Sequence, residues 1–404
     1  MARIVQKFGG TSVGDIARIK NVALRVKAEV DRGNQVAVVV SAMSGVTNQL
    51  VDYCTQMAPL HDAREYDAVV ATGEQVTSGL LAIGLQELGI QARSWAGWQI
   101  PIISDDAHGK ARIESINGAA MIAEMEKGHV AVIAGFQGIA PGNRVSTLGR
   151  GGSDTTAVAL AAALKADRCD IYTDVDGVYT TDPRIVKSAK KLDKVTYEEM
   201  LEMASLGAKV LQTRSVEMAM KHHVRVQVLS SFSDARGTLV CDEDEIVEKA
   251  LVSGIAYSRD EAKVTLIGVQ DAPGIAAGIF GPLATANINV DMIVQNISRD
   301  GTTDVTFTTP RADLERALKV VKDSMKVPYK SIDTDKAVVK VSVIGVGMRS
   351  HAGVAQTMFK ALADKNINIH IISTSEIKVS VLISEEYTEL ALRALHTAYG
   401  LDAA

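Results

Sequence analysis

Aromatic side chains are scarce in this chain: they make up 4% of its 404 residues, whereas hydrophobic residues as a whole make up 47%. Valine, isoleucine, leucine and alanine must therefore fill the core, and such cores suit layers of helices and strands better than an aromatic-rich β-sandwich. Basic charge is also lacking, because 43 lysines and arginines stand against 48 aspartates and glutamates, for a formal net charge of −5. No basic face is indicated, so nucleic acid is not an expected partner.

Cysteine is rare as well. The three cysteines, Cys54, Cys169 and Cys241, are widely spaced and form no C-x-x-C pair. This pattern argues against a disulfide framework or a zinc cluster and favours a reducing, cytoplasmic setting. The chain starts directly with an amphipathic strand and lacks the apolar segment of a signal peptide. Its apolar run at residues 157–164 is far shorter than the roughly 20 residues that span a bilayer, so no membrane association is expected.

The length suggests two to three domains, and the first half of the chain has the pattern of alternating strands and helices. Residues 3–8 are expected to form a strand that ends in the Gly-Gly-Thr-Ser stretch at 9–12. A helix with one apolar face follows and stops at Gly33, and residues 35–41 form a strand buried on both faces. This β-loop-α-β order predicts parallel strands, which hold ligands at their carboxyl ends.

The same reasoning places further elements along the first half. Helices are expected at residues 66–88 and 196–206, strands at residues 91–98, 130–136, 170–173, 224–229 and 238–240, and a loop at residues 137–154. The acidic run at 241–248 is expected to be a solvated linker or edge where the first domain ends.

Beyond that break the chain repeats itself. Residues 264–269 resemble residues 341–346, and residues 286–290 resemble residues 365–369, and we expect all four stretches to be strands. Each copy also has a glycine turn, helices and a further strand in the same order. Two copies of a βαββα unit are too few and too small for a solenoid, so we expect them to pack together.

The strongest functional signal is Thr-Leu-Gly-Arg-Gly-Gly-Ser-Asp at residues 147–154. Its glycines let a ligand approach the backbone, and its position before a buried helix offers N–H groups to an anion. Arg150 adds a planar fork suited to a carboxylate or phosphate. The purely structural alternative is a helix N-cap by Ser153 or Asp154 with Arg150 in solvent, and capping is compatible with binding.

Two further candidate site residues are a lysine, Lys7, and a glutamate, Glu74. Lys7, beside Gly9 and Gly10, has the form of a cation with a backbone cradle for phosphate, although Gly-Gly after a strand is more often a tight turn. Neither G-x-x-x-x-G-K-[ST] nor G-x-G-x-x-G occurs, so P-loop and dinucleotide folds are not supported.

Glu74 stands among apolar and small residues. Once buried it requires a cation such as a substrate ammonium, and with Arg150 it could hold an amino acid by both ends; the alternative is a helix face partly open to water.

A polar stretch at residues 174–184 carries three aspartates but lacks the order and the closing glutamate of an EF-hand, so no dedicated metal loop is predicted. One interpretation is a nucleoside pocket with Tyr179 stacking and Arg184 near phosphates. An ordinary turn is the other.

Together these motifs resemble the aspartate kinase family. The resemblance rests on the stretches at residues 7–12, 39–48, 73–74, 135–138, 149–154 and 172–179 in this order. It extends over the whole chain, including the repeated tail, which is similar to a tandem pair of ACT regulatory domains. The chain resembles the monofunctional form, without a fused homoserine dehydrogenase.

The resemblance implies an α/β fold of the amino-acid-kinase type, a mainly parallel sheet sandwiched by helices, followed by two ferredoxin-like βαββαβ ACT domains. It implies a catalytic domain at residues 1–245 and a regulatory region at residues 246–404. The first ACT unit would cover about residues 264–335 and the second about residues 337–404, with a possible strand from residues 250–263.

The resemblance also implies transfer of a phosphoryl group from ATP with Mg²⁺ to the β-carboxylate of L-aspartate, giving 4-phospho-L-aspartate. The catalytic residues would be Lys7 and Asp154. The aspartate pocket would use Ser41, Thr47, Glu74, Arg150, Gly151, Gly152 and Ser153. The nucleotide would contact Lys7, Phe8, Gly9, Gly10, Thr173, Asp174, Tyr179, Arg184 and Lys209. The magnesium ion would come with ATP, and no protein side chain is assigned to it.

Lysine, threonine or both are the effectors that the family implies. One effector site would use Asp271, Ala276, Asn289, Asp291 and Gln295, and a second would use Val354, Asn368, Ile369 and Ser375. The family further implies a homo-oligomer through the ACT domains, and in some relatives a shorter tail-only subunit.

Two alternatives stay open. Another amino-acid kinase could act on glutamate, N-acetylglutamate or carbamate, but those kinases lack an ACT tail. A non-catalytic amino-acid sensor could keep a dead kinase domain, but the intact Lys7, Glu74, Arg150 and Asp154 argue against it.

Overall fold

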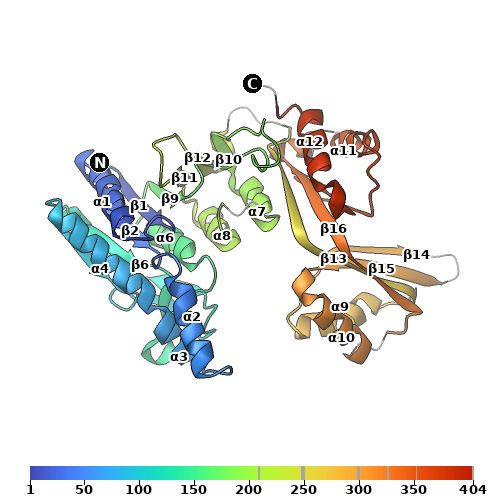
Figure 1. Ribbon diagram of the computed structural model, residues 1–404, viewed down its shortest axis with the longest axis horizontal. Coiled ribbons are helices and arrows are strands. Elements are labelled where there is room, and N and C mark those ends of the chain that lie inside the picture. The colour runs from blue at the N-terminus through green and yellow to red at the C-terminus, as the bar shows by residue number, and fades with distance from the viewer. Residues whose placement is uncertain (208–209, 247–250, 298–300, 325–326, 352, 403–404) are drawn as a thin grey trace. The chain divides into compact units, whose positions relative to one another are not determined.

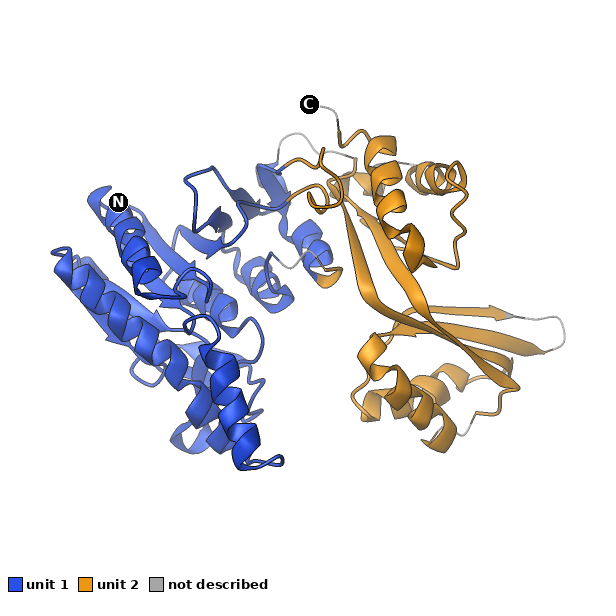
Figure 2. Ribbon diagram, viewed as in Figure 1, with its two compact units in different colours: residues 1–178, 191–204, 209–248 blue, residues 179–190, 205–208, 249–404 orange. Residues whose placement is uncertain are grey.

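The computed structural model describes residues 1–207, 210–246, 251–297, 301–324, 327–351 and 353–402. The chain forms two compact units, and neither is one uninterrupted stretch. The first unit comprises residues 1–178, 191–204 and 209–248, and the second comprises residues 179–190, 205–208 and 249–404 (Figure 2). The segment 179–190 therefore belongs to the second unit, although residues on both sides of it belong to the first.

An eight-stranded sheet forms the centre of the first unit, in the order β10-β12-β11-β9-β1-β2-β6-β3 (Figure 1). Its strands are β1 (Arg3–Phe8), β2 (Gln35–Val40), β3 (Ala92–Trp95), β6 (Val130–Ala134), β9 (Arg168–Thr173), β10 (Lys194–Thr196), β11 (Val226–Ser230) and β12 (Thr238–Cys241). From β11 to β3 all neighbours pair in parallel, whereas β12 is antiparallel to β11. The predicted parallel sheet is confirmed, and the carboxyl ends of β1, β2, β6 and β9 lie at one edge.

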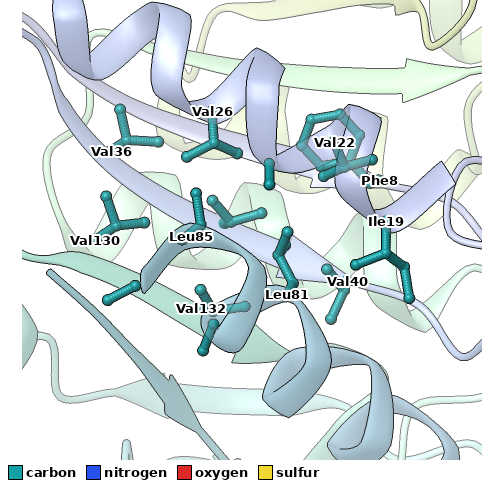
Figure 3. Packing of buried hydrophobic residues seen from close by; sticks show 14 of the residues in the cluster. Phe8, Ile19, Val22, Val26, Val36, Val40, Leu81, Leu85, Val130 and Val132 are labelled. Atoms are coloured by element: carbon teal, nitrogen blue, oxygen red, sulfur yellow. The ribbon is translucent and has the colours of Figure 1, made fainter. Parts of the chain in front are cut away.

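Helices cover both faces of this sheet. The helices in this part of the chain are α1 (Ile16–Asp31), α2 (Val46–Met57), α3 (Ala63–Val70), α4 (Thr72–Glu87), α5 (Ala119–Glu126), α6 (Gly152–Ala163), α7 (Tyr197–Ser205) and α8 (Thr213–His222), of which α1, α4, α5 and α6 contact the strands of this sheet. On one face, Val36 and Val40 of β2 share a buried cluster with Val26 of α1 and with Leu81 and Leu85 of α4 (Figure 3). Alternating strand residues point to opposite faces, which explains why the continuous valine run of β2 is buried on both sides.

The opposite face of β2 is covered by α6. A Cβ built on Gly135 would lie 2.9 Å from Cγ1 of Val39 and 3.0 Å from Ser153 in the first turn of α6, so helix and sheet are in close contact there. All residues of α6 from Gly152 to Ala161 are buried. The predicted buried helix after the glycine-rich stretch is confirmed.

A second, four-stranded sheet of the first unit was not expected. It has the order β5-β4-β7-β8, with β4 (Ile102–Ser104), β5 (Ile113–Ile116), β7 (Gln137–Ala140) and β8 (Arg144–Thr147). The expectation of a loop throughout residues 137–154 is therefore wrong, because β7 and β8 form an antiparallel pair in its first part. Strands this short leave too few alternating positions for a sequence pattern to show.

The single helix expected at residues 66–88 is two helices, α3 and α4, that meet at Ala71. The carbonyl of Ala71 accepts a hydrogen bond from Nε2 of Gln137, at 3.0 Å. This contact comes from outside the helix pair and is invisible in the local pattern. The stretch Ala63–Glu87 passes a length-and-hydropathy test for a membrane span, but half of its apolar window is buried inside the structure, as in a core helix of a folded domain.

The second unit is built on a six-stranded antiparallel sheet in the order β14-β15-β13-β16-β18-β17 (Figure 1). Its strands are β13 (Gly254–Gln270), β14 (Asp291–Ile297), β15 (Thr302–Thr309), β16 (Ser331–Ile344), β17 (Ile371–Thr374) and β18 (Lys378–Ser384), and its helices are α9 (Ile275–Thr285), α10 (Leu314–Ser324), α11 (Val354–Ala363) and α12 (Thr388–Ala398). The long strand β13 pairs with β16 along most of its length, so both repeats contribute to one sheet.

Two of the repeated stretches are not strands. Residues 286–290 and 365–369 follow the helices α9 and α11, and the strands begin only at Asp291 and Ile371. Asn287 and Asn366 have φ angles of 55° and 59°, in the left-handed region that commonly ends helices and that asparagine tolerates. The repeated Asn-Ile-Asn pattern therefore marks a helix end, and the strand prediction for both stretches is wrong.

Candidate active site

A cavity of about 520 Å³ lies at the carboxyl ends of the central strands of the first unit. Its lining includes every residue to which the sequence assigned catalysis or acceptor binding, namely Lys7, Ser41, Thr47, Glu74, Arg150, Gly151, Gly152, Ser153 and Asp154. It also includes Gly10 and Asp174, which the sequence assigned to the nucleotide. These residues are far apart in the chain. They meet because β1 lies between β9 and β2, so that the loops after these strands reach the same edge of the sheet.

Lys7 and Asp154 form a largely buried ion pair at this cavity. Nζ of Lys7, near the end of β1, lies 2.5 Å from Oδ1 of Asp154 in the first turn of α6, and each side chain is 11% exposed. An ammonium group held in this way has a defined position, and the low polarity of its surroundings strengthens its interaction with an anion.

Glu74 lies in the first turn of α4 and is only 3% exposed, so the alternative of a helix face open to water is wrong. Its Oε1 accepts a hydrogen bond from the backbone N–H of Ala42 at 3.0 Å. Its buried Oε2 has no hydrogen-bond partner among the described residues. Burial raises the pKa of Glu74 to about 7. A buried carboxylate oxygen without a donor is costly, and a cationic group in the cavity would satisfy it.

The glycine-rich stretch leads into α6 without a side-chain cap. The N-cap residue is Gly151, with φ of 72°, and this glycine has no side chain to cap the helix. The alternative of a cap by Ser153 or Asp154 is therefore wrong. Because backbone N–H groups at a helix start attract negative charge, this end is suited to an anion in the cavity.

Arg150 is exposed at the same cavity. Within the described ranges no carboxylate pairs with its guanidinium. Gly10 contributes by its lack of a side chain, since a Cβ there would lie 3.1 Å from the carbonyl oxygen of Ala42. Among the described residues, the cavity thus brings together the cations Lys7 and Arg150, the orphaned Oε2 of Glu74 and a helix N-terminus.

Several nucleotide contacts expected from the sequence are not part of this cavity lining. The side chain of Phe8 is fully buried and stacks on Tyr172 with 4.5 Å between ring centroids, so only its backbone could contact a ligand. Gly9 and Thr173 lie beside lining residues, and Oγ1 of Thr173 donates to Oδ1 of Asp174 at 3.1 Å.

Tyr179 and Arg184 belong to the second unit, where Arg184 pairs with Asp182 at 2.8 Å. Lys209 lies outside the described residues. The nucleotide contacts assigned to these three residues stay a prediction.

Further lining residues were missed: Thr11, Met43, Ser44, Gly45 and Phe136. All of them follow a strand of the central sheet, so the rule that ligands lie at strand carboxyl ends was a signal for them. Phe136 also has a φ angle of 69°, which is rare for a bulky residue and often marks a functional site.

The residues expected to bind effectors all lie in the second unit. Asp291 forms an ion pair with Lys340 at 2.6 Å, and Lys340 in turn lies 2.9 Å from Glu261. Exposed positions are occupied by Asp271, Ala276, Asn289, Gln295, Asn368 and Ser375, whereas Ile369 is half-buried and Val354 is buried. Nothing in these positions tests their assignment to an effector.

Metal-binding side chains do not gather in a cluster. Across the described residues no group of three or more histidines, cysteines, aspartates and glutamates could hold a metal ion. Asp154 and Asp174 line the cavity and could each offer a carboxylate oxygen to a divalent cation, and nucleotide phosphates would be suitable further ligands.

The comparison with known proteins agrees with this architecture. Residues 2–230 match the amino acid kinase family, and residues 263–324 and 341–399 match ACT domains. An aspartate kinase of Stutzerimonas stutzeri is 57% identical over 405 residues, which cover 100% of this chain and 98% of that relative. The chain belongs to the aspartate kinase family. Aspartate kinases are ATP-dependent phosphotransferases, and this chain is one of them.

Solved structures of the family have the same fold. The crystal structure of E. coli aspartokinase III in complex with aspartate and ADP matches with a TM-score of 0.81 at 28% identity, covering 98% of this chain and 99% of that chain. A second crystal structure, of the same E. coli enzyme with lysine and aspartate, matches with a TM-score of 0.76 at 28% identity, covering 98% of both chains. The expected fold, an amino-acid-kinase domain followed by two ACT domains, is confirmed.

Proposed function

We propose that this aspartate kinase transfers the γ-phosphoryl group of ATP to the β-carboxylate of L-aspartate and releases ADP and 4-phospho-L-aspartate. A carboxylate oxygen attacks the γ-phosphorus, and the bond from that phosphorus to the bridging oxygen of ADP breaks. The acceptor is already ionised at neutral pH, so the reaction requires no general base. Its difficulty is the approach of two anions, which makes positioning and charge stabilisation the main sources of catalysis.

The observation that carries the proposal is the pairing of complementary groups at one cavity. The orphaned Oε2 of Glu74 would accept hydrogen bonds from the α-ammonium group of aspartate, and the unpaired guanidinium of Arg150 would bind the α-carboxylate. The N–H groups of Gly151 and Ser153 at the start of α6 add partial positive charge for the same carboxylate. Gly152, whose N–H donates to the carbonyl of Gly149 at 2.9 Å, lines the cavity between them. Ser41 and Thr47 line the cavity and would contact the acceptor as well.

Lys7 would neutralise the charge that develops on the transferring phosphoryl group, with the backbone of Gly9 and Gly10 beside it. Asp154 holds this ammonium group through the 2.5 Å ion pair. Magnesium bound with ATP would supply additional neutralisation of the phosphate charge. We assign the remaining nucleotide contacts to Thr173, Asp174, Tyr179, Arg184 and Lys209.

The test is ATP consumption coupled to ADP detection, with L-aspartate, L-glutamate, N-acetylglutamate and carbamate as separate acceptors. We expect kcat/KM to be highest by far with aspartate, and a hydroxamate product when hydroxylamine traps the acyl phosphate. A higher kcat/KM with another of these acceptors would assign a different substrate. No consumption with aspartate, together with lysine or threonine binding in calorimetry, would instead favour a sensor with an inactive kinase domain.

We also propose feedback regulation by lysine, threonine or both at the ACT units. The related E. coli aspartokinase III has been crystallised with lysine, which supports an amino-acid effector for this chain. Coupling requires that an effector bind two conformations with different affinity. Initial rates with lysine, threonine and both together, at aspartate concentrations near KM, test the proposal, and rates unchanged at millimolar effector would contradict it.

We propose that the chain is a homo-oligomer through the ACT units, with a shorter tail-only subunit as a possible component. Light scattering of the purified chain would measure its mass in solution. The division into a catalytic domain at residues 1–245 and a regulatory region at residues 246–404 also stays a prediction.

A further inference from the structure

A fully buried carboxylate outside the cavity lining connects the two sides of the proposed acceptor site. Asp67 in α3 is 0% exposed. Its oxygens accept hydrogen bonds from the backbone N–H of Thr147 at 3.0 Å and from the hydroxyl of Thr147 at 2.5 Å. They also accept from the backbone N–H of Gly109 at 3.1 Å and from Nδ1 of His108 at 2.7 Å.

Every one of these partners is a donor aimed at an acceptor. A carboxylate can accept several hydrogen bonds at once, and this one collects them from two segments that are not adjacent in sequence. Because the group has no contact with solvent, each bond is made in surroundings of low polarity, where losing one is costly. Together these hydrogen bonds hold α3 and the segments at Gly109 and Thr147 in one relative arrangement.

The joined elements carry Glu74 and Arg150. On one side, α3 runs through Ala71 directly into α4, whose first turn holds Glu74. On the other side, Thr147 is the last residue of β8 and the first of the glycine-rich stretch 147–154, which contains Arg150. Asp67 is thus the link between the residue for the ammonium group and the residue for the α-carboxylate.

Neighbouring contacts support the same connection. The segment around Gly109 also touches the stretch directly, since a Cβ on Gly149 would lie 3.1 Å from the carbonyl oxygen of Gly109. The guanidinium of Arg214 donates to the carbonyl of Leu148 at 2.6 Å and to the carbonyl of Ala111 at 2.9 Å. Arg214 therefore connects the same two segments through a second set of hydrogen bonds.

We propose that Asp67 is a positioning residue that holds Glu74 and Arg150 in a fixed relative position, which places the α-carbon of the acceptor in the cavity and thereby decides how far its side-chain carboxylate extends toward Lys7. This inference rests on the proposed function of those two residues. An acceptor bound through its α-ammonium and α-carboxylate groups has its side-chain carboxylate at a fixed distance from the bound α-carbon. A misplacement of the reacting group by about 1 Å can cost roughly 100-fold in rate. Aspartate and glutamate differ by one methylene, so their discrimination depends on this distance.

The decisive variant is Asp67→Asn, which keeps the shape of the side chain. In either orientation its amide NH₂ would face the backbone N–H of Gly109, which lies 3.1 Å from both oxygens of Asp67 and can only donate, so that hydrogen bond is weakened. We expect the KM for aspartate to rise at least tenfold while the KM for ATP changes by less than about twofold, and the ratio of kcat/KM for aspartate to that for glutamate to fall at least fivefold. A merely destabilised enzyme would lose active fraction, which lowers the apparent kcat and leaves KM and selectivity unchanged.

Asp105→Asn is the matched control. Asp105 lies in the same segment as Gly109 and accepts hydrogen bonds from the backbone N–H groups of Ala107 and Arg112, at 3.3 and 3.0 Å. It belongs to the local turn and is not hydrogen-bonded to Thr147. We expect this variant to keep the aspartate KM and the selectivity of the parent enzyme.

Where Asp67→Asn yields no folded protein, Thr147 gives the answer. Thr147→Val removes the hydroxyl that donates to Asp67 and should raise the aspartate KM, whereas Thr147→Ser keeps the hydroxyl and should restore it. A parent enzyme that does not phosphorylate aspartate would overturn the proposed function itself. An active parent enzyme in which Thr147→Val, and Asp67→Asn where it folds, keep the parent KM and selectivity would overturn only the role of Asp67.

Discussion

Nζ of Lys7 lies 2.5 Å from Oδ1 of Asp154, at the point where a β-strand end and a helix start meet beside the cavity. Both side chains are only 11% exposed, so each charge depends on the other for compensation. The pair keeps a cation in a fixed place without a bound ligand. A phosphoryl group that enters the cavity therefore meets a positive charge whose position requires no rearrangement.

Replacing Lys7 by alanine should abolish turnover. We expect Lys7→Ala to lower kcat by at least about 1,000-fold, because the charge that faces the transferring phosphoryl group is lost. The fold should survive, since Lys7 lines the cavity and the buried hydrophobic residues of β1 are unchanged. Steady-state kinetics with saturating aspartate and ATP, together with circular dichroism, measures both effects. A kcat similar to that of the parent enzyme would refute the role of Lys7.

A double variant separates charge from folding in the same pair. Removal of Lys7 leaves Asp154 without its counter-charge, which should destabilise the enzyme by up to a few kcal/mol, roughly as for other broken buried pairs. Adding Asp154→Asn to Lys7→Ala should recover part of this stability and none of the activity. Urea unfolding of the single and double variants gives the comparison.

Arg150→Ala should weaken aspartate binding. A lost hydrogen-bonded contact between a guanidinium and a carboxylate is worth roughly 1.5–3 kcal/mol, so we expect the aspartate KM to rise by about 10- to 100-fold. The ATP KM should stay close to that of the parent enzyme. Arg144→Ala is a suitable control, because Arg144 pairs with Glu65 at 2.5 Å and does not line the cavity. An unchanged aspartate KM in Arg150→Ala would move the carboxylate site elsewhere.

The pH dependence of aspartate binding should follow Glu74. Its pKa is raised to about 7 by burial, so the carboxylate is mostly protonated at pH 6 and mostly ionised at pH 8. Because only the ionised form attracts an ammonium group, the aspartate KM should be up to about tenfold higher at pH 6 than at pH 8. KM measured across this range tests the expectation. Glu74→Gln should have a high KM that is independent of pH, and a parent KM that is flat from pH 6 to 8 would contradict the assignment.

The same carboxyl group makes a prediction for stability. A raised pKa in the folded state means that the contribution of Glu74 to stability is fully present below about pH 4.5 and is lost as the pH rises through 7. At pH 8 the free energy of unfolding of Glu74→Gln should therefore exceed that of the parent enzyme by up to about 3 kcal/mol. This difference in unfolding free energy should shrink toward pH 5. Paired urea titrations at the two pH values measure this, and equal gains at both would speak against the burial argument.

Gly151→Ala should disturb the stretch next to Arg150. Gly151 has a φ angle of 72°, and a Cβ there would lie 2.0 Å from Cγ of Gln212. Alanine in the left-handed region costs roughly 1–2 kcal/mol, and the collision with Gln212 adds to this cost. Gly33→Ala is the control, since Gly33 has a φ angle of 81° and nothing lies within 4 Å of the added Cβ. We expect a larger loss of unfolding free energy and a higher aspartate KM for Gly151→Ala, and equal effects of both variants would exclude the collision.

Part of the fold follows from short-range patterns. The valine run of β2 and the apolar face of α1 predict a buried parallel strand and the helix before it, because their periods are complete within one element. The strands of the small sheet were missed because each has only three or four residues. The repeated Asn-Ile-Asn stretches have the local pattern of strands, but asparagines in the left-handed region end helices there.

The site divides in the same manner. Glycines beside Lys7 and Arg150 indicate anion binding, since these residue types suit that chemistry wherever they occur. The hydrogen bonds of Asp67 cannot be predicted from the residues around it, because their partners come from segments that only the folded chain brings near α3. The membership of residues 179–190 in the second unit is equally invisible along the chain.

By itself the amino-acid sequence determined the family, the α/β class and the residue types available for phosphoryl transfer, because propensities and motifs are properties of short stretches. Only the tertiary structure decided that Lys7 meets Asp154 and that one oxygen of Glu74 has no donor within the described part of the chain. Burial, and the pKa that it raises, depend on every atom packed around a group, and that packing exists only once distant segments have folded together.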